Sequence, residues 1–118
     1  MTRPALALAA VILAGCAEPL PVAFTNGDSI VVRPEFLDGL TNPDERAFVW
    51  AHELAHLLRG HHVGAALGED RDDIERDADL WAARTVALYG YSPCAGVRFL
   101  QRHGQTDRAA ALAQATRC

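Results

Sequence analysis

Residues 50–62 read WAHELAHLLRGHH and hold four of the chain's five histidines. His52 and His56 are four residues apart, so on a helix their rings lie one above the other and can reach the same ion. Glu53 is turned about 100° around that helix, given ~3.6 residues per turn. Its carboxylate is then close to the ion without having to bind it, as a general base in metal-assisted hydrolysis must be. We therefore predict His52 and His56 as metal ligands and Glu53 as the base.

The residues before this stretch are typical of a helix start. Asn42 can cap the helix, Pro43 suits its first position, and Glu45 completes a capping-box pattern. The helix should run to about Arg59, where Gly60 is placed to stop it. Its surroundings are apolar, and buried His and Glu side chains without a metal would be costly to desolvate. The alternatives are a surface helix in which the HExxH spacing arises by chance, and a helix that serves packing alone in an exported domain without metal.

A third ligand could come from His62, six residues after His56. This is the spacing of the metzincin motif HExxHxxGxxH. That motif needs glycine three residues after the second histidine, where this chain has Arg59, and it needs a downstream methionine, whereas the only methionine is Met1. The chain therefore lacks two features of the metzincin motif, which argues against His62 as the third ligand.

The other candidate is Glu75, which opens a second predicted helix. Asp79 lies four residues later on the same face, where its carboxylate can accept a hydrogen bond from the far nitrogen of a ligating histidine. The alternative for both is a solvated acidic face, because other acids surround them: Asp72, Asp73 and Asp77. We favour Glu75 as the third ligand, since two paired helices then form one coherent site.

The remaining segments predict a small α+β domain. Residues 22–25 (VAFT) and 29–34 (SIVVRP) flank Asn26-Gly27, a strong signal for a β-hairpin. Residues 60–70 form a glycine-rich connection. The second helix runs from about Asp72 to Gly90, a third from Ser92 to about His103, and a fourth from Thr106 nearly to Cys118. The expected order is an N-terminal hairpin, the HExxH helix, the ExxxD helix and two short C-terminal helices.

The first residues are typical of an export signal. Arg3 precedes an apolar run, Ala5 to Ala14, that is shorter than the roughly 20 residues needed to cross a bilayer. Leu13-Ala14-Gly15-Cys16 resembles the bacterial lipobox, which implies cleavage after residue 15 and lipid on Cys16. Residues 16–21 would be a tether and residues 22–118 the catalytic domain. Among such lipoproteins Ala17 implies sorting to the outer membrane, facing the periplasm. An ordinary secretory signal with an incidental cysteine is the alternative.

Charge and cysteine content narrow the choice of partners and compartment. Removal of Arg3 with the signal changes the formal charge from −4 to −5, and the chain has no lysine. Nucleic acid is therefore an unsuitable partner. If Cys16 carries lipid, the cysteines left are Cys94 and Cys118. These two can form a disulfide in an oxidising compartment, and the alternative is two free thiols.

HExxH followed by ExxxD resembles the gluzincin metallopeptidases. The resemblance implies a zincin-like fold with one Zn²⁺ per chain held by His52, His56 and Glu75. It also implies that Glu53 acts as base and acid and that Asp79 orients a ligand. The order of strand, HELAH helix and ERDAD helix is similar to the family of the CAAX prenyl protease and the bacterial heat-shock membrane protease, from about residue 22 to residue 102.

This closer resemblance has further implications. In that family an edge strand, like residues 29–33 here, holds the substrate backbone as an added strand. The family usually has a longer segment between HExxH and ExxxD, and a downstream His and Arg that stabilise the oxyanion. Here His103 and Arg108 are the candidates, without a convincing motif, and His103 also suits a helix end. His61 and His62 are expected to face solvent or cap carbonyl groups.

We therefore expect a lipid-anchored zinc endopeptidase acting on peptides or proteins. The alternative is a zinc-stabilised binding or chaperone module at the outer membrane. The intact HExxH favours the enzyme, and the weak oxyanion pattern and small size favour the module.

Overall fold

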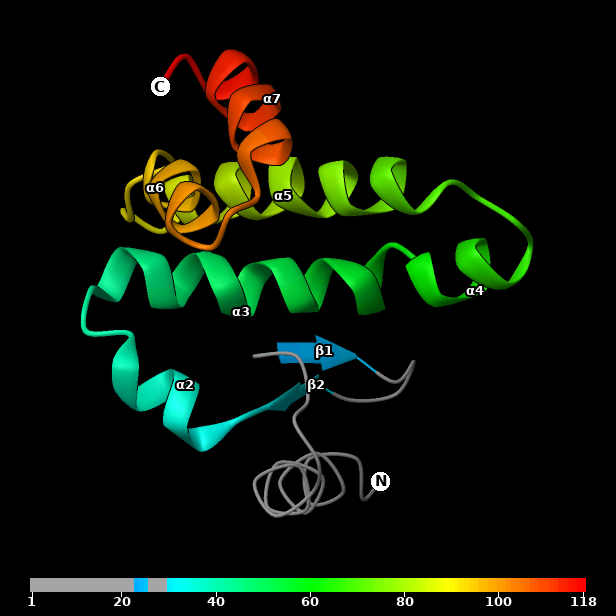
Figure 1. Cartoon of the computed structure of the whole chain (residues 1–118), viewed down its shortest axis with the longest axis horizontal. Coiled ribbons are helices and arrows are strands. Elements are labelled where there is room, and N and C mark those ends of the chain that lie inside the picture. The colour runs from blue at the N-terminus through cyan, green and yellow to red at the C-terminus, as the bar shows by residue number, and fades with distance from the viewer. Residues whose placement is uncertain (1–22, 26–29) are drawn as a thin grey trace.

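The computed structural model describes residues 23–25 and 30–118 of the chain. Two strands that pair antiparallel are followed by helices, the longest of which, α3 and α5, lie side by side (Figure 1). The elements are β1 (Ala23–Thr25), β2 (Ile30–Val32), α2 (Pro34–Gly39), α3 (Pro43–Leu58), α4 (His61–Ala66), α5 (Arg71–Leu88), α6 (Ala95–Arg102) and α7 (Thr106–Thr116).

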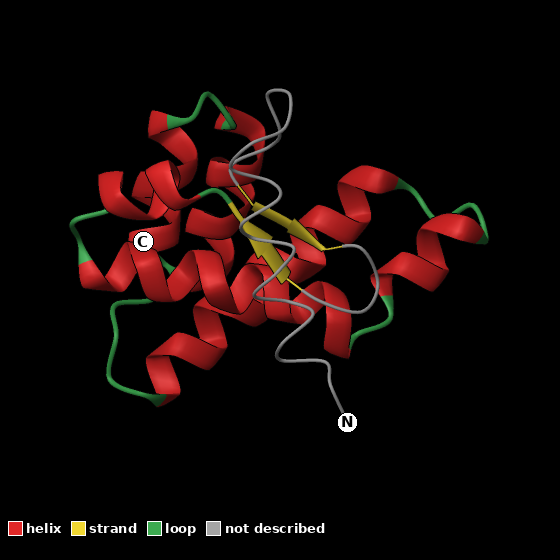
Figure 2. Ribbon diagram, turned by 90° about the horizontal axis from the view of Figure 1, so that it is seen from below, coloured by secondary structure: helices red, strands yellow, loops and turns green. Residues whose placement is uncertain are grey.

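The expected α+β class is wrong, because the described chain is a helical domain. Each strand has three residues, and the two form a narrow ribbon rather than a sheet that could build a layer of the core. Figure 2 shows this ribbon lying over the helices. Two helices were not expected: α2 follows Pro34 directly, and α4 forms within the supposed glycine-rich connection of residues 60–70. The core is built between helices, so the class follows from them.

Local signals explain the ends of α3. The side chain of Asn42 accepts hydrogen bonds from the backbone N–H groups of Asp44 and Glu45, at 2.9 and 3.1 Å, as the cap predicts. The helix ends before Gly60, whose left-handed φ of 66° turns the chain into α4. The capping box is not made, because the Glu45 carboxylate accepts hydrogen bonds from Arg102 on α6 instead.

The helices α3 and α5 pack against each other, and both contain fully buried alanines. Ala55 on α3 and Ala78, Ala82 and Ala83 on α5 have no exposed surface. Small side chains let two helix backbones approach closely, so polar residues on the facing turns come within bonding distance of one another. The two helices run antiparallel in Figure 1, which places the HELAH turns of α3 beside the first turns of α5.

The C-terminal helices close the core on the other side. Phe48 of α3 is 2% exposed, and its ring lies where a Cβ on Gly96 of α6 would stand, 2.4 Å away. Only glycine therefore fits at this crossing. Cys94 and Cys118 form a disulfide with Cα atoms 5.5 Å apart, which confirms the predicted pairing and ties the end of the chain to the start of α6.

Several sequence predictions concern residues outside the described ones. These are the signal peptide of residues 1–15, the lipidated Cys16, the tether of residues 16–21 and the turn at Asn26-Gly27. Among the described helices, none combines the length and apolar character needed to span a bilayer.

Candidate metal centre

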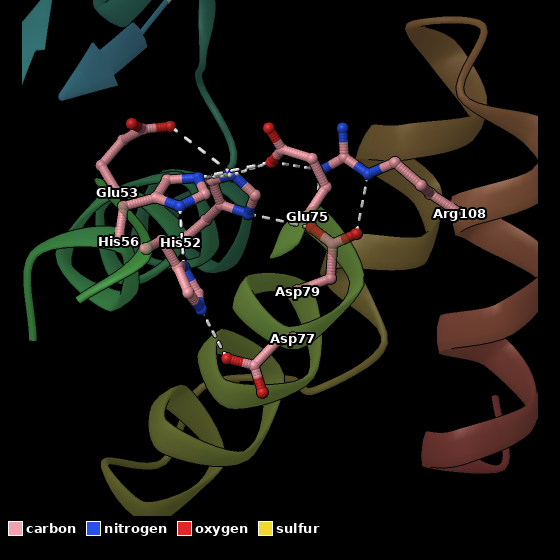
Figure 3. A network of polar contacts seen from close by, with 8 residues as sticks. His52, Glu53, His56, Glu75, Asp77, Asp79 and Arg108 are labelled. Atoms are coloured by element: carbon pink, nitrogen blue, oxygen red, sulfur yellow. Dashed lines mark hydrogen bonds and ion pairs between the residues drawn. The ribbon is translucent and has the colours of Figure 1, made fainter. Parts of the chain in front are cut away.

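Three side chains from two helices bring their donor atoms together. Nε2 of His52 lies 3.0 Å from Nε2 of His56, and the two nitrogens lie 3.1 and 3.3 Å from Oε1 of Glu75. Figure 3 shows both rings projecting from α3 toward Glu75 on α5. Of the two candidates for the third ligand, the structure brings Glu75 to the pair, and His62 is exposed on α4.

The spacing of these atoms fits a tetrahedral metal ion. Zinc bonds of ~2.0–2.1 Å to nitrogen or oxygen, at tetrahedral angles, separate neighbouring donor atoms by about 3.3 Å. The three measured separations, 3.0 to 3.3 Å, are close to that value. Two imidazoles and one carboxylate also match the His₂Glu donor set of catalytic zinc sites, which leave a fourth position open. The residues present therefore fit such an ion.

Asp79 fixes the orientation of His52. Its Oδ1 lies 2.9 Å from Nδ1 of His52, so Nδ1 carries a proton and Nε2 is the nitrogen that faces Glu75. Burial alone raises the pKa of Asp79, but hydrogen bonds with Arg108 and His52 outweigh it and leave that pKa below its ordinary value. Asp79 is therefore an anion at neutral pH, in the place predicted from its spacing to Glu75.

Glu53 is poised to exchange protons. It is 6% exposed, its Oε2 lies 3.7 Å from Nε2 of His52, and its Oε1 is buried without a hydrogen-bond partner. Burial raises the pKa of Glu53, against the opposing charges of His52 and His56. A carboxyl group whose pKa is raised toward neutrality serves better as both proton acceptor and donor. An unsatisfied buried oxygen beside the ligands also indicates a site shaped for a further polar group.

The prediction for His61 is wrong. This residue is 7% exposed, and its Nδ1 lies 2.9 Å from Nδ1 of the ligand candidate His56. Sequence reasoning missed it because Gly60 was taken only as a helix stop. The left-handed Gly60 also turns His61 back under α3, and that combination of glycine and histidine was the available signal.

Arg108 and His103, the two candidates for stabilising an oxyanion, line a cleft together with the candidate ligands, and each already makes hydrogen bonds. Nη2 and Nε of Arg108 bind Asp79, and Nη2 lies 3.9 Å from Oε1 of Glu75. Nδ1 of His103 lies 2.9 Å from the carbonyl oxygen of Phe99, so a neutral His103 keeps its proton there and has none on Nε2. Their role as oxyanion donors stays a prediction.

These groups line one cleft of about 690 Å³. That volume is within the range of about 300–1,000 Å³ usual for ligand sites. The candidate ligand side chains and Glu53 belong to its polar lining, and Phe48, Phe99 and Leu100 belong to its apolar lining. The cleft can thus receive a polar reacting group at the ligands while an apolar side chain packs beside it.

The chain matches one known protein family. Residues 13–73, just over half of the chain, match the model of peptidase family M48. The chain belongs to this family. M48 peptidases are metal-dependent, so the chain is a member of a metallopeptidase family whose expected donor set is present. Searches of curated proteins and of solved structures found no match to the chain.

The family match and the geometry support different parts of the site. The matched residues include His52, Glu53 and His56 and end before Glu75 and Asp79. Glu75 is therefore assigned by its position beside the two histidines.

Proposed function

We propose that this M48 member is a zinc-dependent endopeptidase. The observation that carries the proposal is the convergence of His52, His56 and Glu75 next to the buried, unpartnered carboxylate oxygen of Glu53. When bound, zinc supplies a Lewis acid that polarises a carbonyl group and lowers the pKa of a water molecule toward ~7. The three ligands hold the ion, Asp79 keeps His52 in the required tautomer, and Glu53 accepts a proton and passes it to the leaving amine.

Substrate binding follows from the surroundings of the ligands. Within the described part of the chain, each strand of the β1–β2 ribbon has one unpaired edge, and β1 packs against α3, the helix that carries Glu53. We infer that an extended peptide adds to this ribbon as a third strand, with an apolar side chain against Phe48 and Phe99. Peptides with N-methylated backbone amides should then be cleaved poorly, whereas unmodified peptides of the same sequence are cleaved.

We propose that, within family M48, the chain is similar in function to the CAAX prenyl protease and the bacterial heat-shock membrane protease. We further propose that lipid on Cys16 anchors the protein in the bacterial envelope, at the outer membrane facing the periplasm. Mass spectrometry of the protein expressed in a Gram-negative host should find a diacylglyceryl group that is absent from Cys16→Ser. An unmodified thiol at Cys16 would defeat the anchor, and the peptidase proposal would stand without it.

A zinc-stabilised binding or chaperone module is the second candidate. The specific observation in its favour is that Arg108 and His103 already donate hydrogen bonds to Asp79 and to a backbone carbonyl, so that only part of their donor capacity is left for an oxyanion. Such a module would bind zinc and peptides in the same cleft without turnover.

One experiment separates the candidates. Zinc per chain and cleavage of a broad peptide pool are measured for the full chain and for Glu53→Gln. The enzyme proposal predicts one zinc in both proteins and a loss of cleavage of at least about 100-fold in Glu53→Gln. Zinc without cleavage in either protein favours the binding module. Absence of zinc in the unmodified protein contradicts both, and cleavage by Glu53→Gln defeats the role of Glu53.

A further inference from the structure

A second network of contacts lies behind the other histidine ligand. Nδ1 of His56 is 2.9 Å from Nδ1 of His61, and Nε2 of His61 is 2.6 Å from Oδ2 of Asp77. Arg59 holds that carboxylate with two hydrogen bonds, 2.5 Å from Nε to Oδ2 and 3.0 Å from Nη2 to Oδ1. Figure 3 shows the contacts running from His56 away from the ligand atoms toward Asp77.

The protons in this network have one consistent arrangement. A histidine that binds metal through Nε2 carries its proton on Nδ1, so His56 donates to Nδ1 of His61. His61 then has its proton on Nε2 and donates it to Asp77. The opposite tautomer of His61 would place two N–H groups against each other at 2.9 Å and leave the Asp77 oxygen without that donor. The carboxylate at the end therefore selects the tautomer of both rings.

The other candidate ligand, His52, has a similar set of contacts. Nδ1 of His52 meets a carboxylate, Asp79, that is held by two hydrogen bonds from an arginine. Nδ1 of His56 contacts His61, and His61 in turn contacts the carboxylate of Asp77. Arg59 binds that carboxylate with two hydrogen bonds. Each imidazole ligand thus has an arginine-clamped aspartate fixing its proton, directly in one case and through a second imidazole in the other.

The chain reaches this arrangement through the turn after α3. Arg59 caps the C-terminus of α3, Gly60 has a left-handed φ of 66°, and His61 begins α4 with 7% of its surface exposed. Both Arg59, which stands where the metzincin motif has glycine, and His61 therefore belong to this network of contacts. They do not ligate the metal; they lie one contact behind the ligand.

We propose that His61, supported by Asp77 and Arg59, is a positioning residue of the metal centre. It holds His56 with its proton on Nδ1 and its Nε2 lone pair aimed between His52 and Glu75. The proposal rests on metal binding at the proposed site and not on cleavage of any substrate. Loss of such an outer hydrogen-bond partner typically weakens metal affinity about 10- to 100-fold.

The variants test the removal and the replacement of the contact. His61→Leu removes both hydrogen bonds, and His61→Gln keeps an acceptor and a donor on one side chain. His62→Leu is the matched control, because it deletes the neighbouring, exposed imidazole. Zinc affinity is measured on the full chain by competition with a chromogenic chelator. We expect His61→Leu to bind zinc about 10- to 100-fold more weakly, His61→Gln to recover part of the loss, and His62→Leu to match the unmodified protein.

A second readout needs no mutation. In the zinc-loaded, ¹⁵N-labelled chain, the ring signals should show Nδ1 of His56 protonated, Nδ1 of His61 unprotonated, and a scalar coupling between these nitrogens across the hydrogen bond. A third readout uses the variant: cobalt-substituted His61→Leu should show a visible absorption spectrum changed from that of the cobalt-substituted unmodified chain, which a purely structural role would not produce. Unchanged affinity in His61→Leu, or a proton on Nδ1 of His61, would overturn the proposal. Absence of zinc in the unmodified protein would instead contradict the proposed function.

Discussion

Arg108 on α7 clamps Asp79 on α5 with two hydrogen bonds, 2.8 Å from Nε to Oδ2 and 2.7 Å from Nη2 to Oδ1. Asp79 is 1% exposed and faces Nδ1 of His52 on its other side. The helix α7, which supplies none of the candidate ligands, thus holds the carboxylate that contacts the candidate ligand His52.

Replacing Arg108 should destabilise the fold because it leaves the buried Asp79 carboxylate without its arginine. We expect Arg108→Met to lower the free energy of unfolding by about 3 kcal/mol, measured by urea titration with a chelator present. The exposed Arg84→Met should change it by less than about 0.5 kcal/mol. The double variant Asp79→Asn/Arg108→Met should recover part of the loss, because the uncompensated charge is gone. A loss as small as that of Arg84→Met would contradict the coupling.

Zinc binding should release protons. Burial alone lowers the pKa of His52, but hydrogen bonds with Asp79 and Glu75 raise that pKa to about 9 in the protein without metal. The raised pKa stabilises the fold of the metal-free protein. This contribution is complete below pH 6.5, the ordinary pKa of histidine, and is lost as the pH rises through about 9. Zinc competes with the same proton, so its apparent affinity should rise by about tenfold per pH unit in that interval. Calorimetry in buffers of different ionisation enthalpy should find proton release at pH 7.5; none would contradict this prediction.

The ion pair of Glu45 and Arg102 should make stability depend on pH in the acid range. A hydrogen bond from Arg102 lowers the pKa of Glu45 against the opposing effect of burial. A lowered pKa gives stabilisation that is complete above pH 4.5, the ordinary value, and is lost as the pH falls through the folded-state pKa. Glu45→Gln should cost about 1 kcal/mol at neutral pH, a modest loss because water screens the half-exposed Arg102.

The difference between Glu45→Gln and the unmodified chain should shrink below pH 4.5. Urea unfolding at a series of pH values, with chelator present, measures it. The control is Glu35→Gln, since Glu35 is exposed and lies 3.8 Å from Arg33. A difference that grows as the pH falls would have the wrong sign.

Gly96 should not tolerate a methyl group. A Cβ there would stand 2.4 Å from the Phe48 ring, which is buried and also forms a wall of the cleft. We expect Gly96→Ala to lower the free energy of unfolding by about 1–3 kcal/mol, although alanine favours helix. Gly39→Ala, with no atom within 4 Å of the added carbon, should be neutral or slightly stabilising. Thermal unfolding of the two variants checks this, and equal melting temperatures would argue against a rigid contact.

Much of this protein could be predicted from local sequence. The Asn42 cap, the stop at Gly60 and the four-residue spacings of His52 with His56 and of Glu75 with Asp79 depend on backbone geometry within a few residues. The class was mispredicted because a hairpin signal says nothing about how wide a sheet becomes. The helix α4 was missed because its glycine, Gly64, is disfavoured in isolated helices; here the Glu69 carboxylate lies against the position where a Gly64 side chain would begin.

By itself, therefore, the sequence determined which residues can carry the chemistry: a pair of imidazoles and a carboxylate on one helix, two carboxylates on another, and membership of a metallopeptidase family. Only the tertiary structure decided how they meet. The packing of α3 against α5 brings Glu75 rather than His62 to the two histidines, the turn at Gly60 places His61 behind His56, and α7 brings Arg108 to Asp79. These are contacts between residues far apart in the chain or across a turn, and their distances depend on packing, which no local pattern encodes.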